Sequence, residues 1–118
     1  MRFLVVDDTS RARKSMKALI EVWYPHSEIC EANNGAEAVQ LIDDFQPELV
    51  LMDARMPVVS GLEATRKIKA KWPQVKIIIL SVFTDYQALA LEAGADGFVS
   101  KGDAPEELRH LLMKLVGD

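Results

Sequence analysis

The sequence predicts an α/β fold in which a five-stranded parallel sheet is covered on both faces by five helices. Two observations predict it. Short runs rich in Val, Ile and Leu recur at strand length, and segments with helically spaced apolar residues separate them. Strands that are apolar throughout need burial on both faces, and parallel neighbours need a helical crossover. The regular alternation of the two patterns therefore favours a parallel sheet.

The five strands are predicted from these apolar runs. In chain order the runs are residues 3–6, 28–32, 49–52, 75–80 and 97–99. The first and third are continuously apolar and the fourth is apolar apart from Lys76, which is typical of central strands, whereas the second and fifth are weaker.

The five helices are predicted from apolar side chains that recur every three or four residues. In chain order they cover residues 12–23, 38–45, 62–72, 86–93 and 108–115. Thr9 or Ser10 can cap the first helix, and the Asn33-Asn34-Gly35 segment precedes the second. Pro25 and Pro73 lie just beyond the first and third helices, where proline is commonly found.

Composition limits what such a domain can do. The chain has 118 residues, with 14 Lys and Arg against 18 Asp and Glu, so one domain over residues 1–118 is expected, with no basic stripe for direct nucleic-acid contact. Its single cysteine, Cys30, excludes an intramolecular disulfide and a multi-cysteine metal site. No apolar run is long enough for a signal peptide or a membrane span. We therefore expect a cytoplasmic protein without membrane contact.

Polar residues follow the predicted strands where ligands bind in parallel α/β sheets, at the carboxyl ends. The residues at these ends are Asp7 and Asp8 after the first strand, Asp53 after the third, Ser81 after the fourth and Lys101 after the fifth. A single aspartate at a strand end is most often a solvated loop residue. Three acids brought to one edge repel one another, and Lys101 compensates only one of these charges. The uncompensated negative charge of these residues therefore favours binding of a divalent metal ion.

Oxygen ligands of this kind suit Mg²⁺, which takes one or two carboxylates together with a phosphate oxygen. A metal, a carboxylate and a lysine at one site form an arrangement suited to phosphoryl transfer to an aspartate. In such a step the metal and Lys101 would neutralise charge on the phosphoryl oxygens. Asp53 is predicted to be the nucleophile.

The chain resembles the receiver domain of two-component response regulators over nearly its full length. The resemblance is carried by the segments at residues 4–8 (LVVDD), 49–57 (LVLMDARMP) with Gly61, 78–81 (IILS) and 94–101 (GADGFVSK). It implies a flavodoxin-like sheet with strand order 2-1-3-4-5. The sequence around Ser81 and before Lys101 is most similar to receivers that carry a C-terminal helix-turn-helix effector.

The resemblance also implies a role for each site residue. Asp53 would accept a phosphoryl group from a histidine kinase or phosphotransfer protein. Asp8, Asp53 and the backbone carbonyl of Arg55 would ligate Mg²⁺, with Asp7 acting through a bound water. Ser81 and Lys101 would hold the phosphoryl oxygens. The protein would catalyse only its own phosphorylation and dephosphorylation, so it is not expected to be an enzyme.

The same resemblance places a conformational switch at Ser81 and Phe98. Phosphorylation would shift the population of a face made by the fourth helix, fifth strand and fifth helix, and so control an output, expected to be transcription. A homodimer through this face is a further expectation. The competing interpretation of Phe98 is that of an ordinary core aromatic residue. The first helix is expected to dock the kinase.

Two other functions compete with this one. A receiver-like interaction module could signal without phosphorylation, because Val82, Phe83 and Arg55 are expected to crowd the entrance to Asp53. The same crowding predicts slow loss of the phosphoryl group, and a half-life of seconds in Mg²⁺ would contradict that prediction. A Mg²⁺-dependent phosphatase of the haloacid dehalogenase type fits less well, because it needs aspartates two positions apart and a cap domain.

Overall fold

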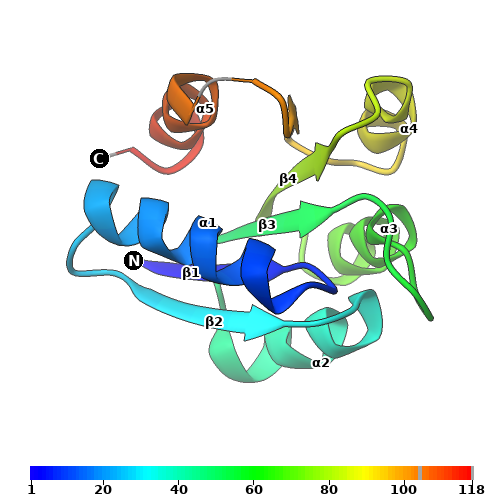
Figure 1. Ribbon diagram of the computed structural model, residues 1–118. Helices are drawn as coiled ribbons and strands as arrows, with labels where there is room; N and C mark the ends of the chain where they lie inside the picture. The colour runs from blue at the N-terminus through cyan, green and yellow to red at the C-terminus, as the bar shows by residue number, and fades with distance from the viewer. Residues whose placement is uncertain (104, 118) are drawn as a thin grey trace.

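The computed structural model describes residues 1–103 and 105–117, and it confirms the predicted order of strands and helices (Figure 1). The elements are β1 (Arg2–Val6), α1 (Ser10–Trp23), β2 (Glu28–Ala32), α2 (Gly35–Phe45), β3 (Leu49–Asp53), α3 (Gly61–Lys71), β4 (Lys76–Ser81), α4 (Tyr86–Glu92), β5 (Gly97–Ser100) and α5 (Pro105–Val116). All neighbouring strands are parallel, in the order β2-β1-β3-β4-β5. This order is the flavodoxin-like one that the resemblance implied.

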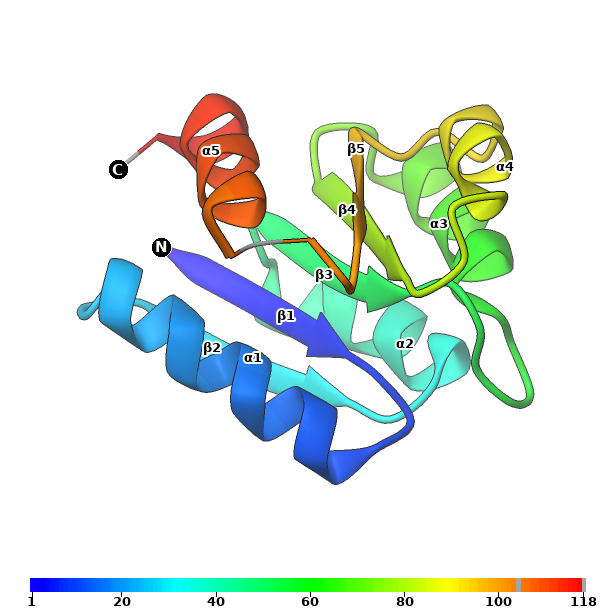
Figure 2. The same ribbon diagram turned by 45° about the horizontal axis from the view of Figure 1, so that its top comes forward.

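Successive residues of the central strands bury their side chains on opposite faces of the sheet. Along β1, Phe3 and Val5 join the apolar cluster under α1 and α5, whereas Leu4 and Val6 join the cluster under α2, α3 and α4. Figure 2 shows α1 and α5 on one side of the sheet and the other three helices on the opposite side. This two-sided burial explains why both faces of the central strands are apolar, over residues 3–6, 49–52 and 77–80.

The ends of several elements differ from their predicted positions. Asn34 caps α2, since its side chain accepts a hydrogen bond from the backbone N–H of Glu37. Thr9 is the N-cap residue of α1, but its side chain makes no capping bond and donates instead to Asp7. Strand β4 starts one residue later than predicted, because the N–H of Val75 closes a turn onto the carbonyl of Trp72. These hydrogen bonds between near neighbours, rather than the spacing of apolar residues, set the ends of the elements.

The parallel arrangement brings the carboxyl ends of β1, β3, β4 and β5 to one edge of the sheet (Figure 1). Val6 pairs with Met52, so the next residues along these adjacent strands are Asp7 and Asp53. Asp53 in turn pairs with Leu80, the residue before Ser81. In the described part of the chain, no helix combines the length and the apolarity that crossing a membrane requires.

Candidate functional site

The predicted acidic residues lie together at the carboxyl edge of the sheet. Asp7, Asp8 and Asp53 each place one carboxylate oxygen within 4.8 Å of those of the other two. Asp7 is buried, Asp53 is half-buried and Asp8 is exposed. The exposure of the three carboxylates therefore increases from Asp7 in the interior to Asp8 at the solvent.

Asp7 uses both of its carboxylate oxygens for contacts within the protein. Its Oδ1 accepts hydrogen bonds from the backbone N–H and the hydroxyl of Thr9, at 3.0 and 3.2 Å, and its Oδ2 accepts one from Lys101 Nζ at 2.9 Å. Burial alone would raise the pKa of Asp7, but the donors at Thr9 and Lys101 outweigh it and hold that pKa below its usual range. Asp7 is therefore a firmly ionised anchor for the lysine.

The pKa of Asp53 is shifted in the opposite direction from that of Asp7. Burial raises the pKa of its carboxyl above the usual value, and the neighbouring charges of Asp7 and Asp8 add to this effect. The ammonium of Lys101, 3.6 Å from Asp53 Oδ1, and a hydrogen bond from the backbone of Arg55 oppose the rise without cancelling it. Negative charge on Asp53 is thus under-compensated by the protein.

Lys101 connects the two carboxylates. Burial would lower the pKa of its ammonium, but the hydrogen bond and charge of Asp7 and the charge of Asp53 raise it overall, so the side chain stays positive. Its backbone N–H donates to the carbonyl of Ser81, which ties the end of β5 to the end of β4. The buried Ser81 hydroxyl accepts a hydrogen bond from the N–H of Phe83.

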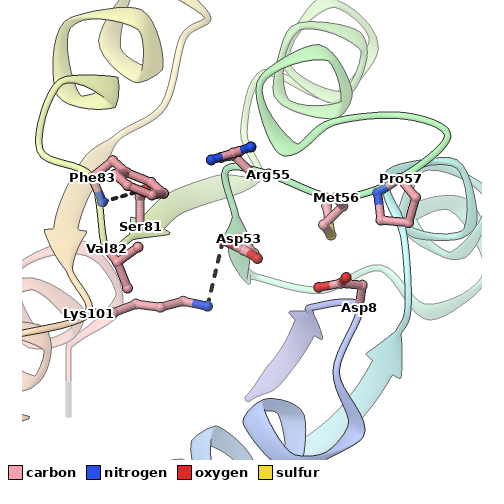
Figure 3. Close-up of a pocket in the computed structure, with 9 residues that line it drawn as sticks. All are labelled: Asp8, Asp53, Arg55, Met56, Pro57, Ser81, Val82, Phe83 and Lys101. Atoms are coloured by element: carbon pink, nitrogen blue, oxygen red, sulfur yellow. Dashed lines mark hydrogen bonds and ion pairs between the residues drawn. The ribbon is translucent and has the colours of Figure 1, made fainter.

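These residues surround an open cavity of about 440 Å³ (Figure 3). It is lined by Asp8, Asp53, Arg55, Met56, Pro57, Ser81, Val82, Phe83 and Lys101. The guanidinium of Arg55 lies over the ring of Phe83, with its central carbon 5.2 Å from the ring centroid. Arg55, Val82 and Phe83, which were predicted to crowd the entrance to Asp53, all line this cavity, and two of them contact each other.

The acidic cluster fits a hard divalent cation. All its side-chain donors are oxygens, and three carboxylates share one partly buried site with a single lysine, so net negative charge remains. Both oxygens of Asp7 already accept hydrogen bonds, whereas Asp8 faces solvent. A cation at this position would therefore contact Asp8 and Asp53 more readily than Asp7.

Phe98 is not one of the residues that line the cavity. It lies on β5, is half-buried, and packs against the apolar cluster beneath α2, α3 and α4. Phe98 is therefore separated from the cavity that the other predicted site residues Asp8, Asp53, Ser81 and Lys101 line.

Sequence reasoning missed the role of Thr9. The sequence predicts Thr9 only as a possible helix cap, whereas its two donors orient Asp7. An aspartate followed two residues later by threonine is a spacing that often produces such a local turn, so this signal was present. Met56 and Pro57 also line the cavity, although no role had been predicted for their side chains.

Comparisons with known proteins identify relatives over almost the whole chain. A protein-family model described as the response regulator receiver domain matches residues 3–113. The transcriptional regulatory protein YdfI of Bacillus subtilis is 39% identical over 113 residues, covering 94% of this chain and 53% of that protein. The chain spans about half the length of the curated relatives it matches.

Solved structures give the same result. A DNA-binding response regulator of the LuxR family from Staphylococcus aureus superposes with a TM-score of 0.87 at 30% identity, covering 97% of each chain. The receiver domain of a sensor histidine kinase from Pseudomonas aeruginosa PAO1, described with a magnesium ion in its active site cleft, has a TM-score of 0.86 at 26% identity, covering 99% of this chain and 98% of that one. The similarity to regulators with a DNA-binding effector agrees with the subfamily expected from the sequence.

Proposed function

This chain belongs to the response regulator receiver domain family, and from that premise we propose that it is a cytoplasmic phosphorylation switch with Asp53 as its phosphoacceptor. The observation that carries the proposal is the position of Lys101, whose ammonium contacts both Asp7 and Asp53 beside a cavity that Asp8 and Ser81 also line. Receiver domains are signalling modules, so the phosphorylated protein itself is the product.

The proposed reaction transfers a phosphoryl group from a phosphohistidine of a histidine kinase or phosphotransfer protein. A carboxylate oxygen of Asp53 attacks phosphorus, and a P–O bond forms as the P–N bond breaks. The electron pair of the broken bond stays on the imidazole nitrogen, and the ring leaves as neutral imidazole because its other nitrogen carries a proton. The product is an acyl phosphate on Asp53.

The residues around Asp53 support this reaction by their charge and hydrogen-bonding capacity. Lys101 is positive and would move from its 3.6 Å contact with Asp53 Oδ1 to a phosphoryl oxygen. The Ser81 hydroxyl accepts from Phe83 and keeps its proton available for a second phosphoryl oxygen. Asp7 would hold Lys101 in place throughout.

Mg²⁺ is the proposed cofactor. Asp8, Asp53 and the Arg55 carbonyl would hold it, with Asp7 contributing through a water, and the bound ion would neutralise charge on the transferring phosphoryl group. The oxygen-only cluster supports this assignment, as does the magnesium ion described in the Pseudomonas aeruginosa receiver domain.

The proposed output is control of transcription through the face formed by α4, β5 and α5. Leu89 and Leu91 on α4 and Met113 on α5 are large apolar side chains exposed on these helices. Exposed apolar groups of this kind are available for a partner domain or for a second copy of the chain. We propose that Ser81 and Phe98 couple the phosphorylated site to this face, and that DNA contact belongs to an effector rather than to these residues.

The test is an intact-mass measurement after incubation with Mg²⁺ and acetyl phosphate. We expect a gain of one phosphoryl group in the natural protein and in Asp44→Ala, which removes an exposed carboxylate on α2, and no gain in Asp53→Ala. No gain in the natural protein, even with its kinase, would favour an interaction module that works without phosphorylation. Turnover of unrelated phosphate esters would favour the phosphatase.

A further inference from the structure

A line of side-chain contacts runs from the loop after Asp53 to the start of α4. Arg55, two residues after Asp53, lies over the ring of Phe83, which is two residues after Ser81. The Phe83 ring meets the ring of Tyr86 edge to face, with centroids 6.3 Å apart and planes at 61°. Tyr86 is the first residue of α4. Arg55, Phe83 and Tyr86 are called the Arg–Phe–Tyr stack below.

The inner end of the stack packs into the protein core. Tyr86 is half-buried and contacts the apolar cluster beneath α2, α3 and α4, the cluster that Phe98 also joins. A shift of the Tyr86 ring would therefore change the packing of the first turn of α4. Phe83 and Arg55, by contrast, lie at the cavity, and the exposed fraction of Phe83 is 46%.

The guanidinium of Arg55 is available for an anion. Among residues 1–103 and 105–117, no carboxylate forms an ion pair with Arg55. Its guanidinium lies over the Phe83 ring instead. A phosphoryl group on Asp53 would enter the cavity that Arg55 lines. Charge-assisted hydrogen bonds from a guanidinium to phosphoryl oxygens are stronger than a half-exposed contact with an aromatic face.

Phe83 is held by both sides of the site at once. Its backbone N–H donates to the Ser81 hydroxyl at 3.0 Å, and its ring receives the Arg55 guanidinium. A phosphoryl group on Asp53 would attract both the Ser81 hydroxyl and the Arg55 guanidinium. Figure 3 shows Arg55 extending towards Phe83 from above Asp53, with Ser81 beside the Phe83 ring. Phe83 is therefore the residue where changes at both groups combine.

We propose that the Arg–Phe–Tyr stack carries the phosphorylation signal from Asp53 to α4. On phosphorylation the Arg55 guanidinium leaves the Phe83 ring for the phosphoryl oxygens, and the released Phe83 ring changes its contact with Tyr86. This inference rests on the proposed phosphorylation of Asp53 and adds to it a route that starts from the Arg55 side chain.

The test compares aromatic ring resonances by NMR in the natural protein, Arg55→Gln, Phe83→Leu and Arg66→Gln. Arg66→Gln is the matched control, because it removes an exposed arginine from α3, away from the cavity. Each sample is recorded before and after treatment with Mg²⁺ and acetyl phosphate, and intact mass reports how much of it is phosphorylated.

In the natural protein and in Arg66→Gln, phosphorylation is expected to shift the ring resonances of Phe83 and Tyr86. In Arg55→Gln the resting protein should already show displaced Phe83 resonances. The Tyr86 shift on phosphorylation should be lost in Arg55→Gln and in Phe83→Leu. Full-sized Tyr86 shifts in both variants, with phosphorylation verified by mass, would overturn the stack as the route. A natural protein that gains no phosphoryl mass would instead overturn the proposed function, and the route with it.

Discussion

The two adjacent aspartates at the end of β1 have different tasks because their surroundings differ. Asp7 is buried and accepts hydrogen bonds from Thr9 and Lys101, whereas Asp8 is exposed beside the cavity. Successive residues at a strand end point in different directions, so one can anchor the lysine while the next faces solvent. The structural contribution of Asp7 and the proposed metal contact of Asp8 can therefore be separated by mutation.

Asp7 is expected to make stability depend on pH. Its folded-state pKa lies below the ordinary value of 3.8, so ionised Asp7 stabilises the folded state above that pH, and this contribution is lost as the pH falls through the folded-state pKa. Asp7→Asn should lower the free energy of unfolding at neutral pH by about 1 to 2 kcal/mol. Urea unfolding with EDTA should show this difference shrinking below pH 3.8. A difference that stays constant down to the acid limit would contradict the assignment.

Gly61 lets the loop after β3 return close to the backbone of Asp53. A Cβ at this position would lie 1.9 Å from the backbone oxygen of Asp53, so no side chain fits without moving backbone. Gly61→Ala should cost about 3 kcal/mol of unfolding free energy. Gly102→Ala is the matched control, because its nearest neighbour would be Ser100 Oγ at 3.8 Å. Chemical denaturation of both variants checks this, and equal midpoints would be inconsistent with it.

At the scale of elements, Lys69 fastens the amino-terminal edge of the sheet. Its ammonium donates to the carbonyls of Pro73 and Val75 and to Asp96 Oδ2, which also accepts from the N–H of Ile77. The lysine thus joins the end of α3, the turn into β4 and the residue before β5. Three acceptors around one half-buried ammonium make this more than a surface ion pair.

Lys69→Met is expected to destabilise the fold by about 2 kcal/mol, since it leaves Asp96 and two carbonyls without a charged donor. Lys67→Met removes a lysine from the same helix whose ion pair with Glu63 is more than half exposed on both sides, and it should change stability by less than about 0.5 kcal/mol. Thermal unfolding of the two variants distinguishes them. An equal loss of stability in both variants would show that the hydrogen bonds of Lys69 add nothing beyond the positive charge on the helix.

Features of this chain that depend on local sequence were predictable, and features that depend on loop paths were not. The strands were predictable because apolar runs report burial directly, and the cap at Asn34 because capping is local. The pairing of Lys101 with Asp7 joins residues 94 positions apart, and it was expected only in outline, from strand ends meeting at one edge. The stacking of Arg55 on Phe83 and the bonds of Lys69 depend on loop paths that periodicity does not encode.

At the scale of the whole molecule, the fold accepts local electrostatic repulsion at one edge of an otherwise well-buried sheet. The core clusters on the two faces bury large side chains fully, whereas the carboxylates of Asp8 and Asp53 remain close together with incomplete compensation. Natural proteins commonly give up stability at functional sites in this way. A cation that relieves the repulsion should stabilise the entire fold.

Mg²⁺ is therefore expected to raise the melting temperature. A ligand at about 100 times its dissociation constant adds about 2.7 kcal/mol to the folded state, which corresponds to several degrees in a domain of this size. Asp8→Asn should lose this shift, and Asp44→Asn should keep it. Scanning fluorimetry at matched ionic strength measures the effect. A shift of equal size in all three proteins would indicate general salt stabilisation.

The two border strands of the sheet affect how the molecule behaves in a crowded solution. Strand β2 carries Glu28 and Glu31 along one border, and β5, at the other, has only four residues. Charges and short length on border strands hinder the addition of a foreign strand, the first event in aggregation. The molecule can thus present apolar helical surfaces to its partners at high concentration, while its sheet resists growing into fibres.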